Sequence, residues 1–282
     1  MKKMNSILIS GCSSGIGLCA AKGLQQRGYR VFASARQTVD VEKLNQQGLE
    51  SVLLDLSDSS SITAAVETVL TQTGGELYAL FNNAAYGQPG AVEDLSREVL
   101  RQQFETNLFG THELTNLVIP VMRKQGYGRI IQNSSVLGLA ALPYRGAYNA
   151  SKFALEGLSD TLRLELHGSG IHVSLIEPGP IESRFRANAF AMFQQNINRQ
   201  NSPHRDYYRG VEARLAKQGH AQPFTLPPEA VLKKVIHALE SSRPKPRYYV
   251  TVPTYLFGYA RRLLSSRLLD KILLKVSSGE NQ

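Results

Sequence analysis

Short apolar runs alternate with longer segments of helical periodicity along most of the chain. The apolar runs, bounded by glycine, proline or polar clusters, predict strands. Between them, apolar positions recur three and four residues apart and predict helices, among them residues 96–124, 147–167 and 227–241. Strands alternating with helices predict an α/β fold, a parallel sheet covered on both faces. Its seven predicted strands are residues 6–10, 30–35, 52–56, 77–81, 128–133, 171–176 and 248–252.

Two segments interrupt this alternation. Residues 184–225 contain helical pieces and several aromatic side chains among many polar ones. After the last predicted strand, residues 254–276 mix leucines with arginines and lysines, as a basic amphipathic helix does. We therefore divide the chain into a single domain, residues 1–253, and a basic C-terminal extension, residues 254–282. The extension either lies on an anionic membrane surface or over the substrate mouth, or it packs on its own domain or a dimer partner.

Composition narrows the class of protein. The 282 residues are 42% hydrophobic and 20% charged, which is ordinary for a globular chain. The formal net charge is +9, but much of the positive excess lies in residues 226–282, which contain ten basic and four acidic side chains. The excess is therefore a feature of the C-terminal part of the chain and not a general nucleic-acid footprint. Cys12 and Cys19 form no Cys-x-x-Cys pair and the six histidines have no ligand spacing, so we expect neither a disulfide framework nor a metal. A reducing, cytoplasmic setting follows.

A glycine-rich turn follows the first predicted strand at once. Gly11, Gly15 and Gly17 form a Gly-x-x-x-Gly-x-Gly pattern between that strand and a helix. Glycines let the backbone approach a pyrophosphate closely, and the N–H groups at a helix start meet its charge. In this context the pattern predicts a dinucleotide site. The alternative is a glycine-rich turn without a ligand.

The ends of the second and third predicted strands bear on which dinucleotide is bound. Arg36 ends the second strand, and no acid stands at Ser34 or Ala35. A guanidinium suits a 2′-phosphate whereas an acid would hold a free 2′-hydroxyl, so these residues favour NADP(H) over NAD(H). A merely solvated Arg36 is the alternative. Asp55, after the third strand, either faces the adenine amine or caps the next helix, a role also open to Asp58.

Candidate chemistry lies between the fifth and sixth predicted strands. Ser135 follows residues 128–133, and Tyr148 precedes Lys152 by four residues on the next predicted helix. Four residues are about one turn, so the phenol and the ammonium share a face. A neighbouring cation would lower the pKa of the phenol from about 10 toward the working range. Ser135 could then hydrogen-bond a substrate oxygen while Tyr148 exchanges a proton with it; an exposed helix pair is the alternative.

These residues fall at the carboxyl ends of the strands, where parallel α/β sheets bind ligands. Asn107 is a further candidate site residue, because asparagine is mildly unfavourable in the middle of a predicted helix and its presence there hints at a task. From Ile7 to Val252 the ordered motifs resemble those of the short-chain dehydrogenase/reductase family, with its Rossmann-like, doubly wound fold. The motifs are Ser10-Gly11-x-x-x-Gly15-Ile16-Gly17, Asn82-Asn83-Ala84, Asn107, Ser135, Tyr148-x-x-x-Lys152 and Pro178-Gly179. Ser10 and Ser183 replace the family's usual threonines, and Ala85 replaces its usual glycine.

The resemblance implies a catalytic tetrad of Asn107, Ser135, Tyr148 and Lys152. Tyr148 would donate or accept the proton and Ser135 would orient the substrate oxygen. Lys152 would hold the nicotinamide ribose and lower the pKa of Tyr148, and the backbone of Asn107 would anchor a water in a proton relay. The implied cofactor site consists of Gly11, Ser13, Ser14, Gly15, Ile16, Gly17, Arg36, Asp55, Leu56, Asn83, Ala84, Tyr148, Lys152, Pro178, Gly179, Ile181 and Ser183.

The residues around the tetrad are similar to the hydroxysteroid and retinol dehydrogenase-like branch and to bacterial NADP-dependent aldehyde reductases. This similarity implies NADP(H)-dependent reduction of an apolar aldehyde or ketone, with residues 184–225 as a substrate lid. The alternatives are a steroid or retinoid alcohol dehydrogenase working oxidatively, and a non-catalytic NADP(H)-binding sensor or scaffold. The family also implies a homo-oligomer. We expect a small apolar carbonyl or alcohol as substrate, no nucleic acid, and peripheral membrane contact through the extension.

Overall fold

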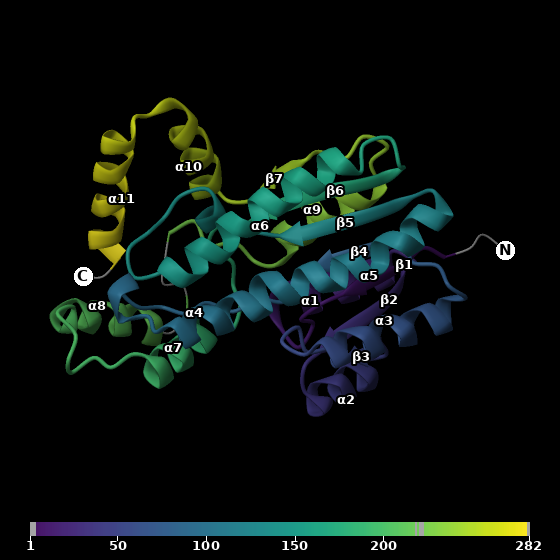
Figure 1. The fold of residues 1–282 in the computed structure, drawn as a ribbon, viewed down its shortest axis with the longest axis horizontal. Helices are drawn as coiled ribbons and strands as arrows, with labels where there is room; N and C mark the ends of the chain where they lie inside the picture. Colours follow the sequence, from purple (N-terminus) through teal and green to yellow (C-terminus); the bar gives the residue numbers. More distant parts are fainter. Residues whose placement is uncertain (1–3, 218, 220–222, 281–282) are drawn as a thin grey trace.

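The computed structural model describes residues 4–217, 219 and 223–280. Within them, seven strands form one parallel sheet in the order β3-β2-β1-β4-β5-β6-β7 (Figure 1). This order confirms the predicted single-domain, Rossmann-like α/β fold, and its direction reverses between β1 and β4, where such sheets bind ligands. The strands are β1 (Ser6–Ile9), β2 (Arg30–Ala35), β3 (Glu50–Leu53), β4 (Ala79–Asn82), β5 (Gly128–Asn133), β6 (Ile171–Glu177) and β7 (Arg247–Tyr249).

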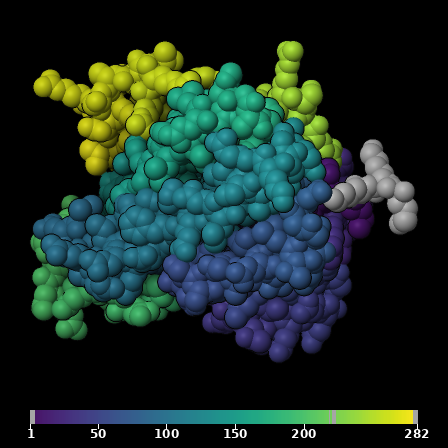
Figure 2. Space-filling model, turned by 45° about the vertical axis from the view of Figure 1, so that its right-hand side comes forward, coloured from purple at the N-terminus to yellow at the C-terminus, as the bar shows by residue number. Residues whose placement is uncertain are grey.

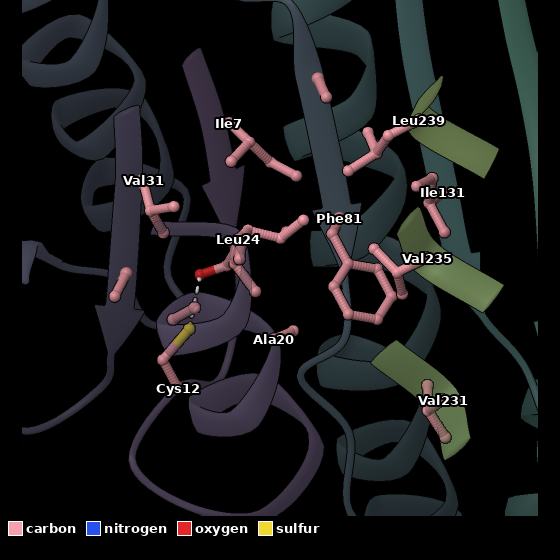
Figure 3. Packing of buried hydrophobic residues seen from close by; sticks show 14 of the residues in the cluster. Ile7, Cys12, Ala20, Leu24, Val31, Phe81, Ile131, Val231, Val235 and Leu239 are labelled. Atoms are coloured by element: carbon pink, nitrogen blue, oxygen red, sulfur yellow. Dashed lines mark hydrogen bonds between the residues drawn. The ribbon is translucent and has the colours of Figure 1, made fainter. Parts of the chain in front are cut away.

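Helices cover both faces of the sheet. One face packs against α1 (Gly15–Gln26), α2 (Thr38–Gln46) and α9 (Glu229–Glu240). In Figure 3, Leu24 of α1 and Val235 of α9 converge on the strands from this side. The other face packs against α3 (Ser59–Thr73), α5 (Gly110–Gln125) and α6 (Gly146–Glu165). Because both faces are covered, the central strands are apolar on both sides, as buried parallel strands must be.

The predicted helix over residues 96–124 is a composite. Its first part, α4 (Arg97–Phe104), gives way to a π-helical turn (Glu105–Phe109) that leads into α5. Turns of this type are rare and are frequent at functional sites, and Asn107 lies in this one. Gly110 begins α5 so close to the exit of β3 that an added Cβ would lie 1.8 Å from the Leu56 carbonyl oxygen. Only glycine fits there.

Two predicted strands end three residues earlier than predicted, whereas the carboxyl ends of the other five differ by one residue at most. The third, predicted over 52–56, ends at Leu53, because the chain turns at Asp55, whose carboxylate accepts hydrogen bonds from the N–H and hydroxyl groups of Ser57. The seventh, predicted over 248–252, ends at Tyr249, because α10 (Val252–Leu263) begins three residues later with a proline in its first turn. The helical extension thus starts at Val252, two residues before the predicted boundary.

The two segments that break the alternation lie at the carboxyl edge of the sheet. The predicted lid forms α7 (Phe185–Asn196) and α8 (Arg205–Ala216), and the extension forms α10 and α11 (Ser266–Glu280). Figures 1 and 2 show them in green and yellow on the side of the molecule away from the N-terminus. Residues 218 and 220–222 of the predicted lid, and residues 1–3 and 281–282 of the predicted domain and extension, lie outside the described residues.

Candidate active site

A cavity of about 910 Å³ opens along the carboxyl edge of the sheet, from the glycine turn past α6 to α7 and α8. Its volume is within the range of small-molecule and cofactor sites. Gly17 and Asn107 are not among its lining residues. The other predicted site residues all line it: Gly11, Ser13, Ser14, Gly15, Ile16, Arg36, Asp55, Leu56, Asn83, Ala84, Ser135, Tyr148, Lys152, Pro178, Gly179, Ile181 and Ser183.

The glycine turn brings backbone against the cavity wall. Gly11 and Gly15 adopt positive φ angles of 73° and 57°, which side chains disfavour. A Cβ on Gly11 would lie 2.8 Å from Ala84 Cα. A Cβ on Gly17 would lie 2.2 Å from the Gly11 carbonyl oxygen, so Gly17 allows α1 to pack on the turn instead of lining the site. The first N–H groups of α1 therefore stand at the cavity, as binding of a pyrophosphate requires.

Ser10 and Asn83 hold this turn in place. The Ser10 hydroxyl oxygen accepts hydrogen bonds from the backbone N–H groups of Asn83 at 2.9 Å and Ala84 at 3.0 Å. In return, the Asn83 amide donates to the carbonyl oxygens of Ser10 at 3.0 Å and Gly11 at 3.1 Å. The serine that replaces the family's threonine thus uses its hydroxyl to join β1 to β4. The Asn83 side-chain amide thus stabilises the conformation of the glycine turn.

The adenosine end of the predicted site contains Arg36 and Asp55. The Arg36 side chain is exposed on the cavity wall. Burial raises the pKa of the nearby Tyr86 phenol, while the charge of Arg36 acts to lower it. Asp55 lines the same wall but does not begin α3. That helix is capped by Asp58, which accepts a hydrogen bond from Ser60 N at 2.9 Å. Asp58 therefore caps α3, and a contact with the adenine amine stays the prediction for Asp55.

Ser135, Tyr148 and Lys152 lie together in the middle of the cavity. The Ser135 hydroxyl hydrogen-bonds with the Tyr148 phenol, and its oxygen also accepts from Leu137 N at 3.1 Å. Lys152, one turn along α6, donates from Nζ to the Asn133 carbonyl oxygen at 2.7 Å and lies 5.7 Å from the centroid of the Tyr148 ring. The fold thus joins a hydroxyl from the end of β5 to a phenol and an ammonium on α6.

Burial governs the ionisation of these groups. It raises the pKa of Tyr148 to about 12, while the hydrogen bond with Ser135 acts to lower it. Burial also lowers the pKa of Lys152 to about 8, while the negative charge of Glu156 acts to raise it. Desolvation of the phenol thus dominates the pKa of Tyr148, and the lowering by Lys152 that the sequence implies stays a prediction. A phenol in this state keeps its proton at neutral pH.

Asn107 lies buried behind the cavity and ties two elements together. Its Oδ1 accepts a hydrogen bond from Tyr86 N at 3.1 Å. Its Nδ2 donates to the Tyr86 carbonyl oxygen at 2.9 Å and to the Ser151 hydroxyl at 3.2 Å. The side chain therefore links the segment after β4 to α6, next to Lys152. The role that the family resemblance implies for its backbone stays a prediction.

A group of buried charges behind the site was not predicted. Arg247 of β7 pairs with Glu156 and Asp160 of α6, and at 2.7 Å with Glu177 at the end of β6. Burial raises the pKa of the fully buried Glu177 to about 8, and Glu156 adds to this effect while Arg247 opposes it. Glu156 lies one turn beyond Lys152, so the cluster adjoins the site. Glu156 and Glu177 lie 91 and 70 residues from Arg247 in sequence, so no local pattern reveals the cluster.

The lid contributes less aromatic surface to the cavity than its sequence suggests. Phe185 packs edge-on against Tyr148 with 5.2 Å between the ring centroids, and Met192 also lines the cavity. Phe193 and Tyr208, in contrast, are buried in a core of the lid itself, and Tyr207 is exposed. Sequence reasoning missed most of the other lining residues here. They include Val136, Leu137, Leu142, Ala189 and Leu215, together with the polar Gln88, Gln102, Glu105, Arg145, Asn188 and Arg214.

In the part of the chain that the structure describes, no group of three or more His, Cys, Asp or Glu side chains is placed to hold a metal ion. The side chains that meet in the cavity offer a hydroxyl, a phenol and an ammonium, beside a glycine turn suited to a dinucleotide. A phenol that holds its proton, with a serine hydroxyl beside it, can hydrogen-bond and protonate a carbonyl oxygen.

Comparisons with known proteins agree with this geometry. Residues 5–193 match the family described as short chain dehydrogenase. An uncharacterized oxidoreductase of Escherichia coli (strain K12), YbbO, is 46% identical over 268 residues, which cover 95% of this chain and 93% of the relative. An NADPH-dependent 3-dehydrocapnine reductase of Ornithobacterium rhinotracheale is 32% identical, with 96% and 97% covered. A short-chain dehydrogenase structure from Streptomyces avermitilis gives a TM-score of 0.79 at 27% identity, with 99% and 98% covered.

Proposed function

Because this chain belongs to the short-chain dehydrogenase/reductase family of oxidoreductases, we propose that it reduces apolar aldehydes or ketones to alcohols with NADPH. The observation that carries the proposal is the meeting of Ser135, Tyr148 and Lys152 in one cavity with the glycine turn. NADPH, when bound, supplies the hydride. The protein supplies alignment, the proton and the exclusion of water.

Tyr148 is the proton donor of the proposed reaction. Its pKa of about 12 keeps the proton in place until negative charge develops on the carbonyl oxygen. The Ser135 hydroxyl holds that oxygen and stabilises the phenolate that remains. Lys152 places a cation beside the phenol and offers the route by which the proton is replaced. Asn107 fixes the segment around Tyr86 against α6 and so keeps the wall of the site in register.

The proposed cofactor is NADP(H), and the residues present fit it. The backbone at Gly11 and Gly15 leaves room that a side chain would fill, and α1 begins at the same wall. At the other end Arg36 offers an exposed guanidinium in place of an acid, which suits a 2′-phosphate. The similarity to an NADPH-dependent reductase supports the same choice.

The proposed substrate is lipophilic. Phe185, Met192, Leu137 and Leu142 give the wall beyond Tyr148 an apolar surface, although the same region also carries polar groups. Apolar walls with few convergent polar groups select apolar ligands. For the whole protein we propose a homo-oligomer in the cytoplasm, as the family resemblance implies, with peripheral membrane contact through the extension.

The test is an assay of purified protein with NADPH or NADH and a panel of aldehydes and ketones, followed at the nicotinamide absorbance. We expect turnover of medium-chain carbonyls with NADPH. Tyr148→Phe should lower kcat by about 10²–10⁴-fold and leave NADPH binding, measured by fluorescence, nearly unchanged. Tyr207→Phe, the same change on an exposed lid residue, is the matched control and should leave kcat unchanged.

Three outcomes would count against the proposal. Binding of NADPH without turnover of any carbonyl would favour a non-catalytic sensor. Turnover of alcohols alone would favour the oxidative dehydrogenase. Near-full activity of Tyr148→Phe would remove the assignment of the proton donor.

A further inference from the structure

The outward face of α10 is apolar. Five large side chains on it are between 43% and 80% exposed: Val252, Tyr255, Leu256, Tyr259 and Leu263. At 3.6 residues per turn they fall within roughly one third of the helix circumference. Scattered apolar residues on a surface need no explanation, but a continuous stripe along a helix marks an interaction site. We call these five residues the α10 stripe.

The next helix, α11, adds positive charge to the extension. Arg267, Lys271 and Lys275 of α11 recur every fourth residue and so form one exposed face of that helix. The opposite face of α11 packs inward through Leu269 and Leu273. Arg262 on α10 is exposed as well. The extension therefore presents an apolar stripe together with a row of cations.

The extension is also attached to the wall of the cavity. Leu269 and Leu273 of α11 and Phe257 of α10 pack in one cluster with Leu137 and Leu142. Both of these last residues line the cavity. The contact is strengthened by Arg261, whose guanidinium donates to the Leu139 carbonyl oxygen at 3.0 Å. The helix that carries the stripe is thus attached to the wall of the cavity, in the part of the molecule shown in yellow in Figure 1.

We infer that the α10 stripe and the basic face of α11 bind an anionic membrane surface, and that the cavity takes its carbonyl substrate from that membrane. Apolar side chains with interfacial tyrosines enter the boundary between headgroups and acyl chains, while arginine and lysine attract anionic headgroups. In the described residues no helix is long and apolar enough to cross a bilayer. The second half of the inference, substrate delivery, rests on the proposed function.

A second copy of the chain fits this surface less well than a membrane. Two copies that meet through the same face around a two-fold axis place like charges near one another. Arg262, Arg267, Lys271 and Lys275 would all be brought to such an interface, against Asp270, the one acid among the side chains of the extension that the structure describes. A negatively charged lipid surface complements the same side chains.

The first experiment measures binding of the full chain to vesicles by co-sedimentation, without substrate or cofactor. We expect wild-type protein to bind vesicles that mix phosphatidylglycerol with phosphatidylcholine, and to be released by salt. Arg262→Glu with Lys271→Glu should weaken binding at least about 25-fold, since each basic residue near such a surface contributes roughly fivefold. Leu263→Asp should weaken it about tenfold or more.

Leu164→Asp is the matched control. Leu164 is 67% exposed, as Leu263 is 80% exposed, but it lies near the end of α6 at the opposite edge of the sheet. This control should bind vesicles as the wild type does. The inference is overturned if wild-type protein does not sediment with anionic vesicles, or if Leu263→Asp binds as tightly as Leu164→Asp. It is also overturned if Leu263→Asp only converts a lipid-free oligomer into monomers.

The second experiment separates membrane delivery from catalysis. Wild type and Leu263→Asp are assayed with a long-chain aldehyde held in anionic vesicles and with a short aldehyde in solution. We expect Leu263→Asp to lose about tenfold on the vesicle-borne substrate and nothing on the soluble one. Equal rates of both proteins on the vesicle-borne aldehyde overturn delivery alone. Absence of turnover with either aldehyde, with vesicle binding intact, overturns the proposed function alone.

Discussion

Arg36, which follows the last residue of β2, should determine whether the protein prefers NADPH or NADH. A guanidinium can bind two oxygens of a 2′-phosphate, and such charge-assisted hydrogen bonds contribute about 1.5–3 kcal/mol. We therefore expect NADPH to bind at least about tenfold more tightly than NADH. Arg36→Asp should invert this preference, with a larger loss on NADPH than gain on NADH, because repulsion needs no precise geometry.

Titration calorimetry with both dinucleotides checks this prediction. Arg123→Asp, which makes the same charge change at the opposite edge of the sheet, should bind both as the wild type does. Raising the salt concentration should weaken binding of NADPH more than binding of NADH. Equal wild-type affinity for the two dinucleotides would make Arg36 an ordinary solvated side chain.

The pKa of the buried Lys152 predicts how the rate of carbonyl reduction depends on pH. Burial lowers the pKa of Lys152 to about 8, so its charge is present below that pH and lost above it. Because kcat/KM reports ionisations of the free enzyme, its value for carbonyl reduction should fall above about pH 8. Glu156→Gln removes a charge that raises the pKa of Lys152, so the fall should move to lower pH. A reductive kcat/KM that rises steadily across this range would contradict the assignment.

Local patterns were sufficient to predict the glycine turn and the Tyr148–Lys152 pair, which the structure brings to one cavity. Gly11, Gly15, Tyr148 and Lys152 each sit in a short motif whose geometry follows from a turn or from helix periodicity. What sequence could not predict was the ionisation state of Tyr148, because desolvation depends on the residues that fold over it. The packing of Phe185 against the phenol is one such contact, and its partners lie 37 residues apart.

At the scale of elements, helix α7 should set the preference for substrate length. Phe185 and Met192 extend the apolar wall beyond Tyr148, and each buried methylene adds about 0.8 kcal/mol, roughly fourfold. We expect kcat/KM to rise with chain length across a series of straight-chain aldehydes and then to level off. Phe185→Ala should flatten the rise and change the rate on the shortest aldehydes least.

Tyr207→Ala is the control for this series, because Tyr207 lies on the lid, is 65% exposed and is not among the residues that line the cavity. Its chain-length profile should match that of the wild type. A flat or falling profile for the wild type itself would remove the lipophilic substrate from consideration.

Element types were predictable, but their interruptions were not. The pattern over residues 96–124 is helical throughout, yet a π-helical turn divides it at residues 105–109. The turn accompanies hydrogen bonds from Asn107 to Tyr86 and Ser151, which belong to other elements. The lid shows the same limit, because Phe193 and Tyr208 look like pocket residues in sequence but form a core between α7 and α8.

At the scale of the whole molecule, the buried acids should make stability depend on pH. Glu177 has a pKa of about 8 in the folded chain, above its ordinary value of 4.5, so the folded state binds more protons between these values. Stability is therefore greatest near the lower value and is lost as the pH rises through about 8. Relative to Glu177→Gln, the wild type should lose up to a few kcal/mol across this window.

Urea unfolding of the wild type and Glu177→Gln at several pH values measures the difference. Glutamine keeps an acceptor for Arg247 but removes the titrating proton. Glu240→Gln, at an exposed ion pair with Arg27, is the control and should follow the wild type. Parallel stability curves for the wild type and Glu177→Gln would show that Glu177 does not titrate in this range.

The cluster of Arg247 with Glu156, Asp160 and Glu177 also has a consequence for how the chain folds during its synthesis. A ribosome synthesises α6 and β6 well before β7, so Glu156 and Glu177 leave the exit tunnel without the arginine that pairs with them. Without Arg247 these buried acids have no cation to pair with, and removing one partner of a buried cluster is strongly destabilising. We therefore expect the nascent domain to stay open at this edge until residue 247 emerges. A chain released before that point should keep Ser135, Tyr148 and Lys152 but expose an unfinished core to proteases.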